Sequence, residues 1–316
     1  MAARFADDAL AAFLNDLNPQ PAPGADAAEP AALREAATQR AAAKPRGPEM
    51  HAVRDLRVPP DGRPARLYRP TPRAGGLVVY LHGGGWVIGD LQTHDRACRR
   101  LASASGLSVL ALDYRLAPEH PWPAAVDDAV GALRWVALPP SELEMVPTAV
   151  AVAGDSAGGT TATLACVRLR DEAPRALPSV QALIYANTDL ANSGASIQEK
   201  RHGFGLEVAD IEWFNSQWVP DRSIFTDPRV SPLFVPDLSG LPAAIVITCE
   251  HDPLRDQGEA YAERLKAAGV PVTARREPGM VHNFMLWDTI SPACAAAADR
   301  VAADLKAALA HPGARH

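Results

Sequence analysis

Residues 149–159 read AVAVAGDSAGG, an apolar run that ends in glycine, a serine and more glycines. The first half has the residues of a buried strand, and the stretch TTATLACVRL that follows has those of a helix. Glycines two positions before and after Ser156 permit a turn tight enough to expose its hydroxyl between strand and helix. The stretch therefore predicts a nucleophilic serine at the edge of an α/β sheet. The alternative is a serine that only caps the helix.

Similar apolar runs recur from Pro64 onward and alternate with helical stretches such as Ala124–Val136 and Gln257–Ala268. Several runs are almost continuously apolar, as parallel strands covered on both faces are. The alternation predicts a doubly wound, mostly parallel α/β sheet. The expected strands are ARLYRP (65–70), GLVVYLH (76–82), SVLALDYR (108–115), AVAVAGDS (149–156), VQALIYAN (180–187), AAIVITCEHD (243–252) and VTARREP (272–278).

Charge and composition narrow the possible partners. Lys and Arg number 31 against 37 Asp and Glu, a net charge of −6, and no basic run stands out, so nucleic acid is not expected. The opening MAARFADDALAAFLND lacks the basic and apolar regions of a signal peptide, and no apolar stretch approaches the ~18 residues of a membrane span. We therefore expect a cytoplasmic protein without a membrane partner.

The cysteines are Cys98, Cys166, Cys249 and Cys294, and no C-x-x-C pair occurs among them. Neither a zinc site nor a disulfide framework is expected from such scattered residues.

A serine hydroxyl is a weak nucleophile, so Ser156 needs a base. In an α/β-hydrolase arrangement the chain order is serine, acid, histidine, which leaves His282, His311 and His316 behind a late acid. The last two lie in a polar tail. His282 follows the predicted last strand, where a loop would present it, and it is the predicted base.

The orienting acid is sought after the strand at 243–252. Asp252 stands in the turn directly behind it, and Pro253 bends the chain there. Glu250 still belongs to the strand end, and Asp256 has the position of a helix start. Asp252 is therefore the predicted acid; an Asx turn for Asp252 and a supporting hydrogen bond for Glu250 are the alternatives.

Three glycines follow another strand in YLHGGGWVIGD (80–90). Bare amides in such a loop can stabilise the oxyanion that forms when Ser156 attacks a carbonyl. Gly83, Gly84, Gly85 and the amide of Ala157 are the candidates. Gly84 and Gly85 are the favoured donors, with Gly83 serving the turn. His82 is expected to shape the loop by a hydrogen bond.

Phosphate-binding and metal-binding alternatives fail on spacing. The glycines miss the last position of G-x-G-x-x-G, no G-K-[ST] follows a glycine-rich loop, and no H-E-x-x-H occurs.

A long, aromatic-rich segment separates the strands at 180–187 and 243–252, with a predicted helix at Glu207–Trp218. Long insertions in compact domains are usually functional, so we interpret it as a lid; a decorative insertion is the alternative. Two alanine-rich helices, Phe5–Leu17 and Ala31–Ala43, flank a Pro-rich break at 18–30 and can join the lid.

The segments divide into domains and pocket candidates as follows. Residues 1–45 are predicted as the N-terminal part of a helical cap, 188–226 as a cap insertion, and 46–187 with 227–316 as the core. The candidates for lining a substrate pocket are Trp86, Asp155, Trp213, Phe214, Trp218 and Asn283. Ordinary packing is the alternative for the aromatic residues.

Six stretches together resemble the hormone-sensitive-lipase-like branch of the α/β-hydrolases, the bacterial type IV esterases. They are HGGGWVIGD, DYRLAPEHPWPAA, GDSAGG, SPLFVPDLSGLP, HDPLRDQGEAYAERL and GMVHNF, in this order between about Val78 and Phe284. The resemblance implies an α/β-hydrolase fold with a helical cap, and Ser156, Asp252 and His282 as catalytic residues beside an HGGG oxyanion hole.

It further implies a carboxylesterase for short to medium acyl esters that uses water and no cofactor, and homodimers are common among relatives. In DYRLAPEHPWPAA, cis bonds are expected at Ala117-Pro118 and Trp122-Pro123. One departure is Asn283. The family usually has glycine after the catalytic histidine, so this residue changes the packing of the loop or adds a polar group beside the alcohol.

Two rival functions share these residues. A deacetylase or lactonase dedicated to one metabolite would differ only in its pocket and cap. A small-molecule receptor on the same scaffold would have lost its catalytic residues, which the intact Ser156, Asp252 and His282 argue against.

Overall fold

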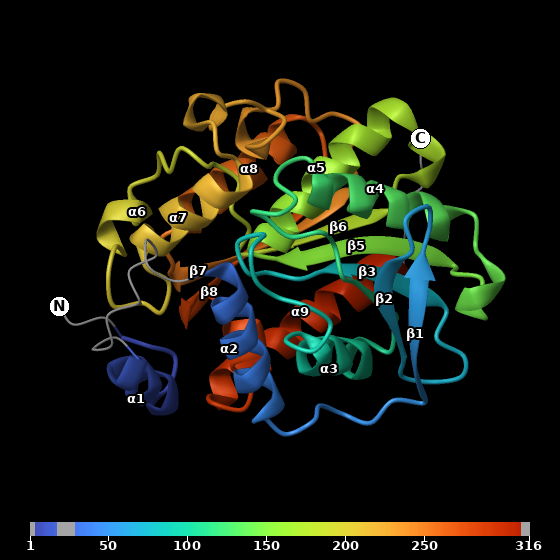
Figure 1. Cartoon of the computed structure of the whole chain (residues 1–316), viewed down its shortest axis with the longest axis horizontal. Coiled ribbons are helices and arrows are strands. Elements are labelled where there is room, and N and C mark those ends of the chain that lie inside the picture. The colour runs from blue at the N-terminus through green and yellow to red at the C-terminus, as the bar shows by residue number, and fades with distance from the viewer. Residues whose placement is uncertain (1–3, 18–28, 311–316) are drawn as a thin grey trace.

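One eight-stranded sheet runs through the computed structural model, which describes residues 4–17 and 29–310 (Figure 1). The strand order is β1-β2-β4-β3-β5-β6-β7-β8. β2 is antiparallel to both of its neighbours, and every later pair in this order is parallel. The predicted mostly parallel α/β sheet is thereby confirmed. The strands are β1 (Ala52–Val58), β2 (Arg63–Arg69), β3 (Gly76–Leu81), β4 (Ser108–Leu112), β5 (Ala149–Asp155), β6 (Val180–Ile184), β7 (Ala243–His251) and β8 (Val272–Val281).

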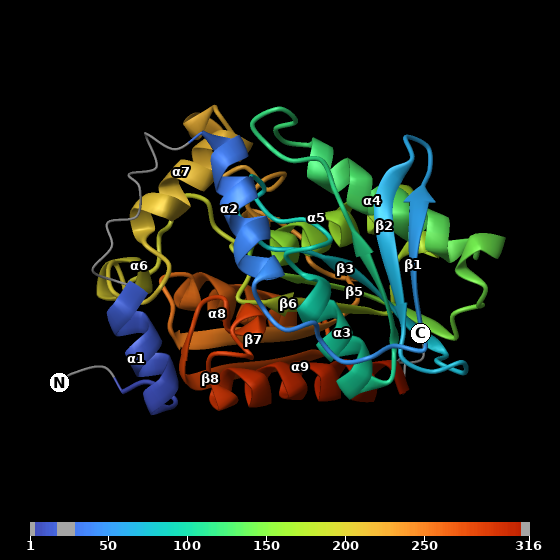
Figure 2. The ribbon, with the colours of Figure 1, turned by 60° about the horizontal axis from the view of Figure 1, so that its bottom comes forward.

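Helices cover both faces of the sheet (Figure 2). α3 and α9 pack on one face, and α4, α5 and α8 on the other. The α-helices are α1 (Asp8–Leu17), α2 (Pro30–Ala42), α3 (Asp95–Ser105), α4 (Ala124–Ala137), α5 (Ala157–Glu172), α6 (Ser196–Glu199), α7 (Val208–Trp218), α8 (Arg255–Ala267) and α9 (Pro292–Ala310). The 3₁₀ helices are η1 (Ser141–Leu143), η2 (Pro174–Ala176), η3 (Arg222–Ile224), η4 (Pro232–Phe234) and η5 (Phe284–Leu286).

Two hydrophobic cores result, one on each face. Along β3, Leu77 and Val79 point into one core, whereas Val78 and Tyr80 point into the other. Successive side chains of a strand alternate between faces, so a strand covered on both sides must be apolar at every position. This explains the nearly continuous apolar runs of the sequence.

The N-terminal helices and α7 lie where they were predicted, within about three residues. Nearly all of the Pro-rich break at 18–30 lies outside the described residues, as do His311 and His316. Neither β1 nor the helices α3 and α9 were expected from the sequence. β1 pairs only with β2 and keeps charged, partly exposed residues along one edge of the sheet, which hides the strand pattern.

α1 is fastened to the core rather than only to a cap. Leu10 and Leu14 are buried in the core that contains α9. Asp7, just before α1, accepts hydrogen bonds from the Leu10 N–H, the Ser291 hydroxyl and the Ala293 N–H. One carboxylate therefore caps the start of α1 and the start of α9 together.

α2, α6 and α7 gather beyond the carboxyl ends of the parallel strands (Figures 1 and 2). The guanidinium of Arg34 on α2 donates to the carbonyls of Val87 and Ala117 and to Glu119. These bonds hold α2 over the loop that follows β3. Both expected cis bonds, Ala117-Pro118 and Trp122-Pro123, are present, and Pro59-Pro60 is cis as well.

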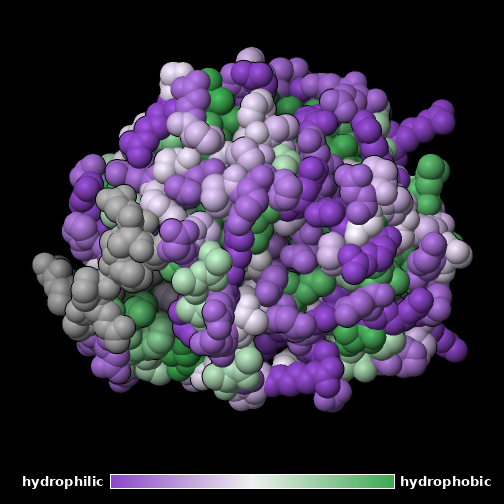
Figure 3. Space-filling model, viewed as in Figure 1, coloured by the Kyte–Doolittle hydropathy of each residue, from purple (hydrophilic) through white to green (hydrophobic). Residues whose placement is uncertain are grey.

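Hydrophilic residues cover most of the face seen in Figure 3, with apolar residues scattered among them. Within residues 4–17 and 29–310, none of the helices has the length and apolar character needed to cross a lipid bilayer.

Candidate active site

Ser156 stands in a sharp turn between β5 and α5. Its φ of 53° and ψ of −122° are rare for a residue with a side chain and place it on a strained junction. A methyl group at Gly158 would overlap the Leu81 carbonyl of β3, so only glycine lets the helix start this close to the sheet. The Ser156 N–H donates to the Ile184 carbonyl at 2.8 Å, which fixes the turn against β6.

The structure brings Ser156, His282 and Asp252 together in one row. The Ser156 Oγ lies 2.9 Å from His282 Nε2, and His282 Nδ1 lies 2.8 Å from Asp252 Oδ2. A carboxylate can only accept, so Nδ1 carries the proton and Nε2 is left to accept the serine proton. The carboxyl group and the imidazole are almost fully buried.

The second oxygen of Asp252 makes the predicted turn. Oδ1 accepts the Leu254 N–H at 2.8 Å, while Oδ2 accepts from His282. The Asx turn expected as an alternative is present, and the same carboxylate also accepts a hydrogen bond from His282. The carboxylate is fixed from both sides.

The loop that carries His282 is also held by residues other than Ser156 and Asp252. Glu250 Oε2 accepts the Gly279 N–H at 2.7 Å, and this bond lowers the pKa of the Glu250 carboxyl group. The Gly279 carbonyl in turn accepts from the Ala6 N–H, so the N-terminal segment braces the same loop. Asp256 lies in the first turn of α8, as expected.

Asn283 adopts the left-handed conformation, with φ 67° and ψ 13°. Glycine enters this region without cost, and asparagine is among the few other residues that tolerate it. The departure from the family's glycine therefore preserves the backbone turn behind His282.

The loop of glycines lies beside Ser156, but one of its predicted donors is already used. The Gly83 N–H donates to Asp155 Oδ1 at 2.9 Å, so the prediction of Gly83 as an oxyanion donor is wrong. Gly84 and Gly85 have φ values of 114° and 59°. In the described part of the chain, no acceptor is hydrogen-bonded to the N–H of Gly84, Gly85 or Ala157.

Asp155 supports this loop from inside the protein. It is 0% exposed and accepts from the Tyr80 hydroxyl as well as from Gly83. The prediction of Asp155 as a pocket residue is therefore wrong, because its carboxylate faces the core side of the loop.

His82 shapes the loop by a hydrogen bond, as expected. Its Nδ1 donates to the Gly83 carbonyl at 2.8 Å, and its own carbonyl accepts from the Tyr114 hydroxyl. Burial, followed by the neighbouring His94, lowers the pKa of His82 to about 4. The imidazole is therefore neutral at physiological pH.

Two predicted pocket residues pack against each other instead. The rings of Trp86 and Trp218 stack with centroids 3.8 Å apart, and their exposed fractions are 1% and 0%. The Trp86 indole N–H donates to the Thr161 hydroxyl. Neither ring has surface to offer a substrate, so both predictions are wrong and ordinary packing is correct here.

Phe214 and Trp213 are half-buried on α7. A methyl group on Gly85 would overlap the Phe214 ring, so this ring lies directly on the glycine loop. Trp213 contacts Phe214 edge-on, with centroids 5.1 Å apart. Both remain candidates for lining a pocket.

Tyr185 was missed by the sequence analysis. Its ring lies 4.5 Å from the imidazole of His282, centroid to centroid. A tyrosine just after a strand is common in cores, and nothing in VQALIYAN distinguishes this one.

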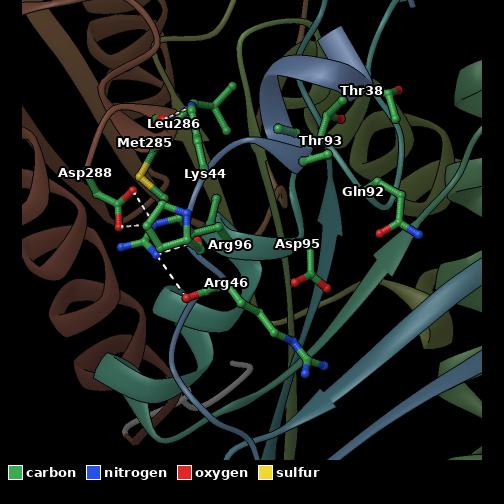
Figure 4. A pocket seen from close by; sticks show the side chains of 14 residues that line it. Thr38, Lys44, Arg46, Gln92, Thr93, Asp95, Arg96, Met285, Leu286 and Asp288 are labelled. Carbon is green, nitrogen blue, oxygen red and sulfur yellow. Dashed lines mark hydrogen bonds and ion pairs between the residues drawn. The ribbon is translucent and has the colours of Figure 1, made fainter. Parts of the chain in front are cut away.

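A cavity of about 330 Å³ lies between the end of α2, the start of α3 and η5 (Figure 4). Its charged groups are largely paired: Arg96 with Asp288, and Lys44 with the Leu286 carbonyl. Ser156, Asp252 and His282 do not line it. The bond from Lys44 to Leu286 beside this cavity links the segment after α2 to η5, which follows His282.

No group of three or more His, Cys, Asp or Glu residues within 4–17 and 29–310 is placed to hold a metal ion.

Comparisons with known proteins identify the family. The family described as alpha/beta hydrolase fold matches residues 78–286. A carboxylic ester hydrolase, LipN, of Mycobacterium tuberculosis is 42% identical over 83% of this chain and 72% of its own length. An ethyl acetate hydrolase of Pseudomonas putida is 41% identical over 72% of this chain and 73% of its own.

A solved structure shows the same likeness. The hyperthermophilic esterase of the archaeon Pyrobaculum calidifontis is 38% identical with a TM-score of 0.85, over 96% of this chain and 98% of its own.

The left-handed turn at Asn283 gives a test of what this residue does. We expect Asn283→Gly to keep the activity and stability of the wild type, because glycine adopts the turn freely. Asn283→Ala should cost about 1–2 kcal/mol of stability and lower kcat, because alanine resists this conformation. Urea unfolding and ester kinetics measure both. If the amide instead binds the alcohol group, both variants will raise KM alike.

The buried His82 predicts acid sensitivity. Unfolded histidine binds a proton below about pH 6.5 and folded His82 only near pH 4, so its share of the stability is full above pH 6.5 and lost as pH falls toward 4. The loss approaches about 1.4 kcal/mol per pH unit.

His82→Gln should flatten this part of the profile of unfolding free energy against pH. His51→Gln, at an exposed histidine, is the control and should leave the slope unchanged. Equal slopes in wild type and His82→Gln would contradict the prediction. The charged or titratable neighbours of His82 are His94, Asp155, Asp90 and Tyr114.

Proposed function

The chain belongs to the α/β-hydrolase fold family and is a carboxylesterase of its hormone-sensitive-lipase-like branch, and we propose that it cleaves short to medium acyl esters through an acyl-enzyme. The observation that carries this proposal is the hydrogen-bonded row from Ser156 through His282 to Asp252.

In the first half of the reaction, Ser156 Oγ attacks the ester carbonyl. Its proton passes along the 2.9 Å contact to His282 Nε2 as the new C–O bond forms. The imidazolium is paired with Asp252, which stays ionised. His282 then gives the proton to the leaving alkoxide, and the C–O bond to the alcohol breaks, which leaves an acyl group on Ser156.

In the second half, water repeats these steps. His282 takes a proton from water, the hydroxide adds to the acyl carbon, and the proton returns to Ser156 as the carboxylic acid leaves. Water and the ester are the only reactants that this sequence requires.

The negative charge that develops on the carbonyl oxygen needs donors. We assign this role to the amides of Gly84, Gly85 and Ala157, whose N–H groups have no acceptor in the described part of the chain. Gly84 and Gly85 have positive φ values, a backbone conformation that glycine adopts without steric cost. Such donors typically contribute about 2.7–4 kcal/mol each to transition-state stabilisation.

Alanine replacements cannot test this assignment glycine by glycine. A methyl group would overlap Asp155 at Gly83, Ile88 at Gly84 and Phe214 at Gly85. All three variants would disturb the loop whether or not the replaced amide is a donor. Of the three glycines, Gly83 alone is left out of the proposed oxyanion hole, because its N–H donates to Asp155.

Contacts of α2 and α7 with the loop after β3 support the proposed cap. We propose that residues 1–45 and 188–226 contribute a cap over the core, 46–187 with 227–316. Phe214 of α7 contacts the glycine loop at Gly85. The Arg34 guanidinium of α2 donates a hydrogen bond to the carbonyl of Val87, just beyond this loop. These contacts favour a small pocket, and the likeness to an ethyl acetate hydrolase supports short acyl groups.

Ser156→Ala should abolish turnover of a short acyl ester. Losing the nucleophile in a serine hydrolase lowers kcat by about 10⁶-fold while the fold persists. Steady-state hydrolysis and thermal unfolding measure the two effects. Ser239→Ala, at an exposed turn, is the control and should keep both. A Ser156→Ala protein with wild-type turnover would exclude the proposed mechanism.

Phe214→Ala should shift the substrate preference toward longer esters. Removing the ring frees space above Gly85, and each methylene accommodated is worth about tenfold or more in kcat/KM. A panel that varies acyl and alcohol length separately measures the shift and assigns Phe214 to one side of the pocket.

Phe234→Ala, on η4 beside α8, is the matched control and should keep the wild-type profile. An unchanged profile in Phe214→Ala would remove this residue from the pocket. Activity of the wild type toward one ester alone would favour a dedicated deacetylase or lactonase.

A further inference from the structure

Tyr185 has a strained backbone at the centre of the site. Its φ is 39°, a region that residues with side chains rarely enter. Trp86, Ser156 and Asn283 also have positive φ values, and each belongs to a loop of the site. Strain of this kind persists only where surrounding contacts enforce it. Tyr185 is the member of this group whose role is still open.

The backbone around Tyr185 joins two of the catalytic loops. The carbonyl of Ile184, the residue before it, accepts the N–H of Ser156 at 2.8 Å. The N–H of Tyr185 itself donates to the Ile247 carbonyl at 2.7 Å, on the strand that leads to Asp252. The end of β6 thus sets the spacing between the nucleophile and the acid.

The side chain reaches the third loop. The Tyr185 ring lies 4.5 Å from the His282 ring at an angle of 53°, and 5.2 Å from Phe284, edge-on at 80°. Its hydroxyl group is buried and has no hydrogen-bond partner among the described residues. The side chain is 1% exposed, so it contacts residues 282–285 from the inside of the protein.

We propose that Tyr185 is the positioning residue for His282: its ring holds the imidazole in line with Ser156 Oγ and stabilises the imidazolium that forms during attack. A cation that lies over the face of an aromatic ring within about 6 Å of its centroid is attracted to it, and the centroids of the Tyr185 and His282 rings are 4.5 Å apart. The attraction exists only after the proton has moved to His282, so it acts on the transition state more than on the bound ester.

Other groups near the two rings do not replace this contribution. Asp252 pairs with Nδ1 of His282 and Ser156 with Nε2, both at the edge of the imidazole, whereas Tyr185 lies against the ring itself. Asp155 and Cys249 lie near Tyr185 as well, and burial raises the pKa of its hydroxyl well above the ordinary value. Tyr185 is therefore neutral throughout the working range of the enzyme.

The test compares Tyr185→Phe with Tyr185→Leu in the full chain on a short acyl ester. Phe keeps the ring and should keep kcat within about threefold. Leu keeps apolar bulk but has no ring, and should lower kcat by about tenfold with little change in KM. The acid limb of kcat/KM against pH should move down by about 0.5–1 unit in Leu, because the imidazolium loses its partner.

A structural role alone would not move the acid limb while thermal stability is kept. Tyr185→Met is the second ringless variant, because its flexible side chain fills irregular space if Leu fails to fold. Tyr185→Gly relieves the backbone strain and removes the ring. It should therefore lose as much kcat as Leu, and full activity in Gly would assign the role to strain and overturn the proposal.

A folded Leu or Met variant with the wild-type kcat and pH profile would also overturn it, as would equal losses in Phe and Leu, which would assign the effect to the hydroxyl. The inference rests on the proposed function. A Ser156→Ala protein that kept its turnover would end both, whereas an unchanged Tyr185→Leu beside an inactive Ser156→Ala would end this inference alone.

Discussion

The buried carboxylate of Asp155 joins Ser156, the proposed nucleophile, to the glycine loop that is proposed to stabilise the oxyanion. Asp155 precedes Ser156, and its Oδ1 accepts both the Tyr80 hydroxyl of β3 and the N–H of Gly83 at the start of the glycine loop. Burial by itself would raise the pKa of Asp155, but His94 and the hydrogen bond from Tyr80 hold it below its ordinary value. An ionised, immobile acceptor thereby orients the loop before any substrate arrives, which is what electrostatic preorganisation requires.

The sequence predicted which residues at the ends of the strands come together in the candidate site. Parallel strands bring their carboxyl ends to one edge, so a serine after β5, an acid after β7 and a histidine after β8 had to converge. The near-continuous apolar runs made those strands visible. β1 escaped prediction because it is an edge strand with charged residues along it, and such strands lack the pattern of a buried one.

The supporting residues could not be read from the sequence, because their roles depend on contacts between distant segments. Trp86 and Trp218 are far apart in the chain, and only the fold shows that they stack and leave no surface for a substrate. Gly83 and Gly84 are identical as residues, but one N–H meets Asp155 and the other does not. The spacing of residues in the sequence indicates which loop carries a group. It does not indicate the direction in which that group points.

The same contacts explain why the site can hold strained residues at all. Trp86, Ser156, Tyr185 and Asn283 each pay for a left-handed or otherwise rare backbone, of order 1–3 kcal/mol for the worst cases. Hydrogen bonds that cross between strands oppose this cost, such as Ser156 to Ile184 and Tyr185 to Ile247. Because these bonds belong to the sheet, a loop cannot relax without breaking pairing in the core. The backbone positions of Ser156 and Tyr185 are therefore fixed by β6 and β7, whereas the proposed cap helices make no part of these bonds.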